Sequence, residues 1–214
     1  MHTKKPGAGK VAGIMLLMTA VELWKDLKIS KNNTMTTKFI QIANQHKTEF
    51  EYFLKKIFPV AMLWEGGGKY HNIPGDSGGP TIWGIAYNKN KKHFDSLADH
   101  KNTTKEEAGA FAFVEYYLPL KPAFLPCKTK LYAFDIAYNM GVGRAKTFIQ
   151  KAIGVTADGI FGPQTEKAMS KLTVEALHKM RVDFYYDLVA KTPKNKKFLK
   201  GWLNRARDVY KRSL

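Results

Sequence analysis

Apolar side chains recur every three or four residues along most of this chain, and this spacing predicts a mainly α-helical protein. The first clear helix covers roughly 38–58 and leads towards Glu65. His46 lies on the apolar stripe of this helix, so we expect that histidine to pack in the core. Further helices are predicted at about 104–117, 130–140, 144–153 and 174–189, with a last one around 202–209.

Local signals support the predicted helix ends. Thr104 and Glu107 have the spacing of a capping box, in which each side chain bonds the other residue's backbone. Gly141 follows the helix at 130–140 and is a typical helix stop. The Lys-rich stretch 191–200 is expected to be a solvated loop.

Residues 65–90 do not continue the helical pattern. Glycine and proline are dense there, which marks tight turns and unusual backbone conformations. Short extended pieces around Tyr70 and at 81–86 predict a small β hairpin. Loops of this kind carry binding and catalytic residues more often than regular elements do.

The charge balance indicates a polyanionic partner. Lys and Arg number 35 against 18 Asp and Glu, a formal net charge of +17. Nucleic acid, an anionic membrane surface and the bacterial cell wall all fit such a field. The basic residues are spread over the whole chain and not clustered on one helix, which disfavours a nucleic-acid-binding protein.

The start of the chain has two interpretations. Lys4, Lys5 and Lys10 precede an apolar run at 11–21, as in a secretory signal. That run is too short for an ordinary membrane span, and no small-residue cleavage site follows it. A surface-docked amphipathic helix or a non-native leader is the other interpretation, and Met35 could be an internal start.

Residues 75–80 read GDSGGP, the nucleophile motif of trypsin-like serine proteases. Those all-β enzymes need a histidine and then an aspartate upstream of the serine. Between His46 and Ser77 the single aspartate is Asp76, which adjoins the serine. A helical chain with this order of residues excludes the protease.

Other site motifs fail on their spacing. Residues 7–10 (GAGK) lack both the first glycine and the Ser or Thr of a phosphate loop. Residues 141–143 (GVG) lack the third glycine of a dinucleotide fingerprint. Cys127 is the single cysteine, and no histidine pair has zinc-ligand spacing. We therefore predict no cofactor and no metal.

The remaining constellation is Glu65, Asp76 and Thr81. Glu65 follows Met62, Leu63 and Trp64, and apolar neighbours favour a protonated carboxyl, which can donate its proton to a glycosidic oxygen. Asp76 and Thr81, on the following loop, would hold a water on the opposite face of the sugar. The alternative is that Glu65 caps a helix and Asp76 makes an ordinary turn.

Residues 64–86 read WEGGGKYHNIPGDSGGPTIWGIA. This segment resembles the signature of glycoside hydrolase family 108, a lysozyme-like family of phage endolysins and bacterial muramidases. The matching positions are Glu65, Gly66, Gly67, Tyr70, Asn72, Asp76, Gly78, Gly79, Thr81, Gly84 and Ile85. Gly68 and Lys69 depart from the family pattern as two apparent insertions before the tyrosine.

A second segment, 131–165, resembles the predicted peptidoglycan-binding region that follows this stretch in the family. The resemblance is carried by Asp135, Asn139, Gly141, Gln150, Asp158, Gly159, Gly162, Pro163 and Thr165. The Asp-Gly and Gly-Pro pairs are also ordinary turn residues before a helix, so they support the fold more than sugar contacts.

The resemblance implies cleavage of the β-1,4 bond between N-acetylmuramic acid and N-acetylglucosamine. It implies Glu65 as the essential acid, with Asp76 and Thr81 as catalytic partners by a looser analogy. Tyr70, Asn72 and Trp83 are candidate substrate contacts. Asp135 and Asn139 lie four residues apart on one helix face, and either line the cleft or make hydrogen bonds along the helix.

We therefore predict a mainly α, lysozyme-like α+β fold: a helical bundle with a small β hairpin beside the active-site cleft. Residues 1–35 would be the leader, 36–125 the catalytic region, and 126–214 a helical peptidoglycan-binding-like region packed into the same globule.

The expected protein is a monomeric lysozyme whose partner is bacterial peptidoglycan, with no nucleic acid and with a transient contact between residues 1–35 and an anionic membrane. It would be made in the cytoplasm and act at the cell wall or in the periplasm. The alternative is a catalytically inactive peptidoglycan-binding or secretion-assisting protein.

Overall fold

The computed structural model describes residues 34–214. The predicted leader, 1–35, lies outside the described residues except for its last two positions. The described residues form one compact unit. Within the described part, no helix is both long and apolar enough to cross a membrane.

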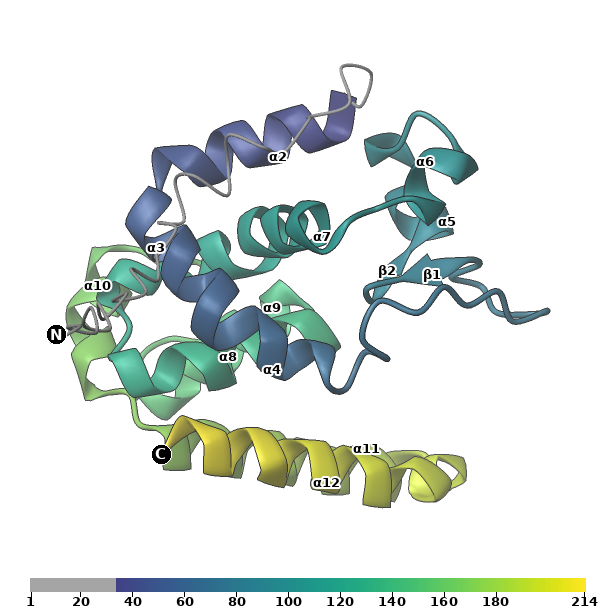
Figure 1. The fold of residues 1–214 in the computed structure, drawn as a ribbon. Helices are drawn as coiled ribbons and strands as arrows, with labels where there is room; N and C mark the ends of the chain where they lie inside the picture. Colours follow the sequence, from purple (N-terminus) through teal and green to yellow (C-terminus); the bar gives the residue numbers. More distant parts are fainter. Residues whose placement is uncertain (1–33) are drawn as a thin grey trace, which may run out of the picture. The chain divides into compact units, whose positions relative to one another are not determined.

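The described chain is mainly helical with one small antiparallel sheet, which confirms the predicted fold class (Figure 1). Short 3-10 and π-helical turns are labelled η. In chain order the elements are α2 (Thr34–Gln45), α3 (Lys47–Tyr52), η1 (Phe53–Ile57), α4 (Phe58–Met62), β1 (Thr81–Ile82), β2 (Ile85–Ala86), α5 (Tyr87–Asn90), η2 (Lys91–His93), α6 (Leu97–Lys101), α7 (Lys105–Ala112), η3 (Phe113–Tyr117), η4 (Leu118–Leu120), η5 (Pro122–Phe124), α8 (Cys127–Met140), α9 (Val142–Ala152), α10 (Pro163–Ala168), η6 (Met169–Lys171), α11 (Val174–Lys191), η7 (Pro193–Asn195) and α12 (Lys196–Ser213).

The first predicted helix is divided into segments. α2 ends before His46, α3 restarts at Lys47, and a π-helical turn (η1) leads into α4. His46 is exposed, so the expectation that it packs in the core is wrong. The helix is interrupted at this residue, so His46 does not continue the apolar face that packs against the core.

An aromatic cluster forms the core under these segments. Phe53 of η1 meets Phe134 of α8 edge to face at 4.8 Å between ring centroids, and it meets Phe113 of η3 at 5.4 Å. All three side chains are fully buried. Edge-to-face pairs of this kind stabilise a core beyond the area they bury, by about 0.5–1.5 kcal/mol each.

Helix α8 lies at the centre of the fold. Its residues from Leu131 to Ala137 are all buried, and it packs against α9, α11, α12, η1 and η3. Gly141 ends it with a positive φ of 91°, as the sequence predicted. The capping box of Thr104 and Glu107 at the start of α7 is also confirmed.

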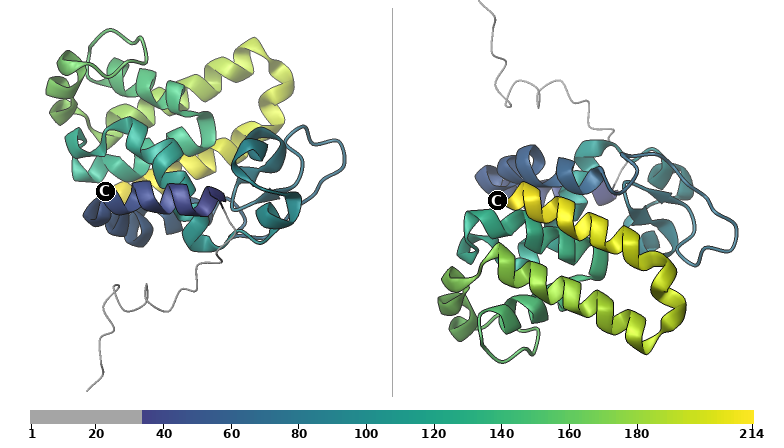
Figure 2. Two further views of the ribbon diagram at one scale, coloured as in Figure 1. Left: turned by 90° about the horizontal axis from the view of Figure 1, so that it is seen from above. Right: turned by 90° about the horizontal axis from the view of Figure 1, so that it is seen from below.

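Helices α11 and α12 lie side by side, joined by η7 (Figure 2). The Lys-rich stretch 191–200 is therefore not a loop throughout, because α12 begins at Lys196. The lysines lie on the exposed face of an amphipathic helix, and their solvation is compatible with helical backbone.

The β hairpin lies at the end of the bundle opposite α10 (Figure 1). Thr81 pairs with Ala86 and Ile82 with Ile85. His71 adds an isolated antiparallel bridge to Thr81, which ties the loop 66–80 to the hairpin.

Candidate active site

A pocket of about 340 Å³ opens between the end of α4, the loop 66–80 and the hairpin. It is lined by Trp64, Glu65, Gly66, His71, Ile73, Asp76, Gly79, Thr81 and Gly84. The structure thus brings together the three residues predicted to be catalytic, Glu65, Asp76 and Thr81. Among the predicted substrate contacts, Tyr70, Asn72, Trp83, Asp135 and Asn139 are not among its lining residues.

Glu65 stands at the turn that ends α4, and its side chain is 20% exposed. Its apolar neighbours Leu63 and Trp64 are exposed, so they do not form the apolar cover that the sequence suggested. The carboxylate is held by charge instead: Oε1 accepts a hydrogen bond from Nη1 of Arg205 at 2.6 Å.

The second carboxylate oxygen, Oε2, accepts no hydrogen bond from the described residues. It faces Gly84, where a Cβ atom would lie 3.0 Å from it and equally close to the ring of Tyr138. Gly84 has a positive φ of 78°, which also favours glycine. The missing side chain at Gly84 leaves room in front of the one glutamate oxygen that is not paired.

Arg205 connects Glu65 to a buried ion-pair network. Its Nη2 donates to Oδ1 of Asp135 at 2.8 Å, and Arg181 donates to Oδ2 of the same carboxylate at 2.7 Å. Asp135 is fully buried. Two carboxyl groups and two guanidiniums thus alternate from the pocket into the core.

The electrostatics of this network favour the charged forms of its buried members. Burial acts to raise the pKa of Asp135, but the guanidiniums of Arg181 and Arg205 outweigh it and hold that pKa below its ordinary value. Burial acts to lower the pKa of Arg205, and the carboxylates of Asp135 and Glu65 outweigh it, so that pKa is raised. Arg205 therefore remains a cation beside Glu65.

Asp135 and Asn139 both accept hydrogen bonds from a neighbouring helix, and neither lines the pocket. Asp135 has no exposed surface for a sugar to touch, so a direct substrate contact is corrected to a structural one. The amide oxygen of Asn139 accepts from Arg181 at 3.4 Å and from Tyr185 at 3.3 Å. Asp135 thus links α8 to α11 and α12, and Asn139 links α8 to α11. Asn139 is exposed, and its contact with substrate stays a prediction.

Asp76 and Thr81 are positioned by local hydrogen bonds. Oδ1 of Asp76 accepts from the backbone of Gly78 at 2.8 Å, which is an Asx turn. The hydroxyl of Thr81 donates to the carbonyl of Gly79 at 3.1 Å, and its lone pairs remain to accept. The GDSGGP hexapeptide is therefore the turn that carries Asp76 into the pocket.

Between residues 70 and 73, every second side chain of the loop lines the pocket. His71 and Ile73 line it, whereas the predicted residues Tyr70 and Asn72 do not. Successive side chains of an extended segment point to opposite faces, and His71 is extended because it bridges Thr81. The prediction of Tyr70 and Asn72 as pocket residues therefore placed the wrong face of this extended segment towards the pocket.

Trp83 supports the pocket from outside. Its backbone has a positive φ of 55°, a conformation that costs a tryptophan on the order of 1–3 kcal/mol. Three contacts hold it there: its indole Nε1 donates to the carbonyl of Thr103 at 2.9 Å, its ring lies over Gly68, and its carbonyl accepts from Tyr138 at 2.6 Å. This strained turn places Gly84 in front of Glu65.

The chain is similar to known proteins over most of the residues that build this site and the helices behind it. Residues 58–141 match the family model of glycosyl hydrolase 108, and residues 144–207 match that of a predicted peptidoglycan domain. Over residues 58–141 the chain is therefore similar to glycosyl hydrolase 108. The whole pocket lies within the first match, which confirms the resemblance to this family that the sequence showed.

A solved structure of SagA from Brucella abortus is similar to this chain. The two share 25% identity with a TM-score of 0.61, over 78% of this chain and 94% of that one. No curated protein matches the chain. The two family matches support a peptidoglycan hydrolase with a peptidoglycan-binding region. They meet at 141–144, whereas the sequence placed a boundary at 125/126, and that boundary stays a prediction.

Proposed function

We propose that this protein is a muramidase of phage-endolysin type. It cleaves the β-1,4 bond between N-acetylmuramic acid and N-acetylglucosamine, with Glu65 as general acid. The observation that carries this proposal is the pocket of about 340 Å³ that holds Glu65, Asp76 and Thr81 together. Such a volume lies within the range of about 300–1,000 Å³ that is usual for ligand sites.

The roles of the two glutamate oxygens follow from their partners. Arg205 orients the carboxyl through Oε1, which leaves Oε2 to carry the proton and give it to the departing sugar oxygen. That oxygen must approach Oε2 within about 2.6–3.2 Å. Gly84, without a side chain, permits this approach.

Asp76 and Thr81 hold the water that attacks the anomeric carbon from the opposite face. Oδ2 of Asp76 receives no hydrogen bond from the described residues, so it can accept a proton from that water. The Thr81 hydroxyl accepts the second hydrogen bond of the water. Bond cleavage then consumes one water, with one proton leaving Glu65 and one arriving at Asp76.

The partners and place of action follow from charge and family. A net charge of +17 enriches the enzyme at an anionic bacterial wall. We propose that it is made in the cytoplasm, acts on the wall as a monomer, and uses residues 1–35 for any contact with an anionic membrane.

The test compares the wild type with Glu65→Gln on purified peptidoglycan, with reducing ends assayed. We expect new N-acetylmuramic acid reducing ends from the wild type and at least a hundredfold fewer from the variant. Glu106→Gln, an exposed glutamate on α7, is the matched control and should retain full activity. A wild type that pellets with the wall but makes no reducing ends would leave the alternative, a binding protein without catalysis.

A further inference from the structure

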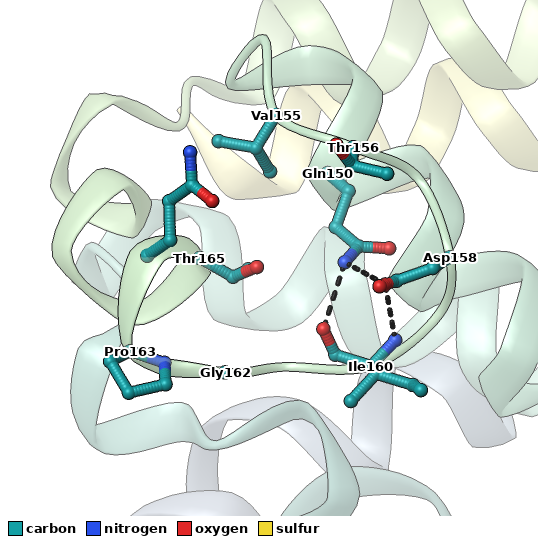
Figure 3. Close-up of a pocket in the computed structure, with 9 residues that line it drawn as sticks. Gln150, Val155, Thr156, Asp158, Ile160, Gly162, Pro163 and Thr165 are labelled. Carbon is teal, nitrogen blue, oxygen red and sulfur yellow. Dashed lines mark hydrogen bonds between the residues drawn. The ribbon is translucent and has the colours of Figure 1, made fainter.

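A second pocket of about 260 Å³ lies within the predicted peptidoglycan domain, between α9 and α10 (Figure 3). It shares no lining residue with the candidate active site. Its volume is slightly below the usual range for ligand sites, which suits a single sugar unit.

The wall of this pocket is held rigid by Gln150. The side chain of Gln150 is buried, and its Nε2 donates to Oδ1 of Asp158 at 2.7 Å and to the carbonyl of Ile160 at 2.9 Å. Its Oε1 accepts from the backbone of Gly159 at 2.7 Å. Figure 3 shows two of these bonds crossing the loop. The loop therefore has its shape before any ligand arrives, which lowers the entropic cost of binding.

Other polar groups of the lining are not used by the fold. Thr156, Gln164 and Thr165 make no side-chain hydrogen bond with the described residues, although Thr165 is buried. One oxygen of Asp158, Oδ2, is likewise free of such bonds. A rigid pocket with uncommitted hydroxyl and amide groups is equipped to bind a neutral polar ligand.

Apolar surface completes the pocket. Ile160 is 69% exposed at its rim, and Val155 and Pro163 line it. An exposed isoleucine next to free amide and hydroxyl groups offers contacts for both parts of an acetamido group, its methyl and its amide.

The charge of the pocket favours the sugar units of peptidoglycan over its stem peptides. The hydrogen bonds that Asp158 accepts from the Ile160 backbone and Gln150 lower the pKa of Asp158, so it is an anion at neutral pH. No Lys, Arg or His lines the pocket. A stem peptide, with its carboxylates, would be repelled there, whereas the neutral N-acetylglucosamine unit would not.

We propose that this pocket is a second, non-catalytic binding site for an N-acetylglucosamine unit of the glycan strand. Gln164, Thr156 and Thr165 bind its acetamido and hydroxyl groups, the free oxygen of Asp158 accepts from a sugar hydroxyl, and Ile160 contacts its methyl group. This inference rests on the peptidoglycan partner of the proposed function and not on the chemistry at Glu65.

The second pocket lies far enough from the active site to hold a different part of the substrate. α10 lies at the end of the bundle away from the hairpin (Figure 1), so one strand can be held there while another occupies the active site. Two sites on one rigid body raise the local concentration of an insoluble, repetitive substrate. They add nothing for a short soluble oligosaccharide, which cannot reach both.

Binding is tested in Glu65→Gln protein, with the double variant Thr156→Val/Gln164→Ala as the perturbation. Its control is Gln45→Ala/Thr48→Val, the same residue types at exposed positions far along the chain. We expect the β-1,4-linked dimer of N-acetylglucosamine to shift the side-chain amide NMR signals of Gln150 and Gln164. The double variant should bind this dimer at the second pocket and the insoluble wall at least tenfold more weakly than the control, the loss expected for two neutral hydrogen bonds.

A second measurement, with Glu65 intact, separates this site from the active site. The double variant should release reducing ends from insoluble peptidoglycan several-fold more slowly and from a short soluble glycan at the control rate. Unmoved Gln150 and Gln164 signals, equal binding by both variants, or shifts caused by a soluble stem peptide and not by the dimer would overturn the inference. If the wild type cleaves nothing but wall binding still depends on Gln164, the muramidase proposal fails and this one stands.

Discussion

Gly84→Ala tests whether the open space in front of Glu65 is needed for catalysis. The new methyl group would lie 3.0 Å from Oε2 of Glu65 and 3.0 Å from the ring of Tyr138. Ordinary contacts are about 3.5 Å or longer, so one of the three groups must move by about half an ångström. Tyr138 is held by its hydrogen bond to the Trp83 carbonyl, which leaves Glu65 and the turn to shift.

The expected loss has two parts. A positive φ of 78° costs an alanine about 1 kcal/mol or more in stability, and the close contacts add a similar amount. Activity should fall further, because in the proposed mechanism the methyl group takes the space through which the sugar oxygen reaches Oε2. A misplacement of about 1 Å costs about a hundredfold, so a shift of about half an ångström should cost roughly tenfold in kcat/KM, or about 1.4 kcal/mol.

Gly154→Ala is the matched control. Gly154 has a φ of 74° with nothing within 4 Å of an added Cβ, so the variant carries the backbone strain without the contacts. Urea denaturation and the release of reducing ends are measured for both variants. If Gly84→Ala keeps the activity of Gly154→Ala, the space beside Oε2 is not used and the role assigned to that oxygen is refuted.

Two further predictions concern the groups that support the site. Arg205→Met should lower the free energy of unfolding by about 3–5 kcal/mol, because Asp135 stays buried with one partner fewer. Urea denaturation measures this loss, and Arg207→Met, at an exposed position, is the control. An equal loss in the control would contradict the prediction. His100 is buried, its Nδ1 has no hydrogen-bond partner among the described residues, and burial lowers its pKa. The histidine of the unfolded chain has a pKa of about 6.5, so below that pH the unfolded chain binds more protons than the folded one. The free energy of unfolding is therefore full above about pH 6.5 and falls as the pH is lowered. In His100→Gln the urea midpoint should change less between about pH 6.5 and 5 than in the wild type. An unchanged slope would show that His100 does not cause the loss.

Local chemistry accounts for the helix predictions that were confirmed. The capping box at Thr104 and the stop at Gly141 depend on a few neighbouring residues, and both formed as predicted. His46 and the lysines at 196–200 were misplaced for a different reason. A bend at His46 and the pairing of α12 with α11 are set by contacts between distant segments, which periodicity does not contain.

The position of Arg205 in the sequence indicates that it is buried and paired. It lies three residues after Trp202 and four before Val209, on the apolar stripe of the last predicted helix. An arginine on such a stripe must find a carboxylate, because an unpaired buried charge is strongly unfavourable. The pattern could thus have indicated a buried ion pair, but it could not have named Glu65 and Asp135 as the partners.

The sequence by itself determined the resemblance to glycosyl hydrolase 108, the helical class, and the order of Glu65, Asp76 and Thr81 along the chain. These follow from local patterns, since turn glycines, caps and helical spacing act within a few residues. The tertiary structure alone decided which loop face lines the pocket and which oxygen of Glu65 remains unpaired. It also decided that Asp135 and Trp83 support the site without lining it. Each of those outcomes depends on contacts between segments up to 140 residues apart, such as Arg205 with Glu65, and such contacts exist only once the chain has folded.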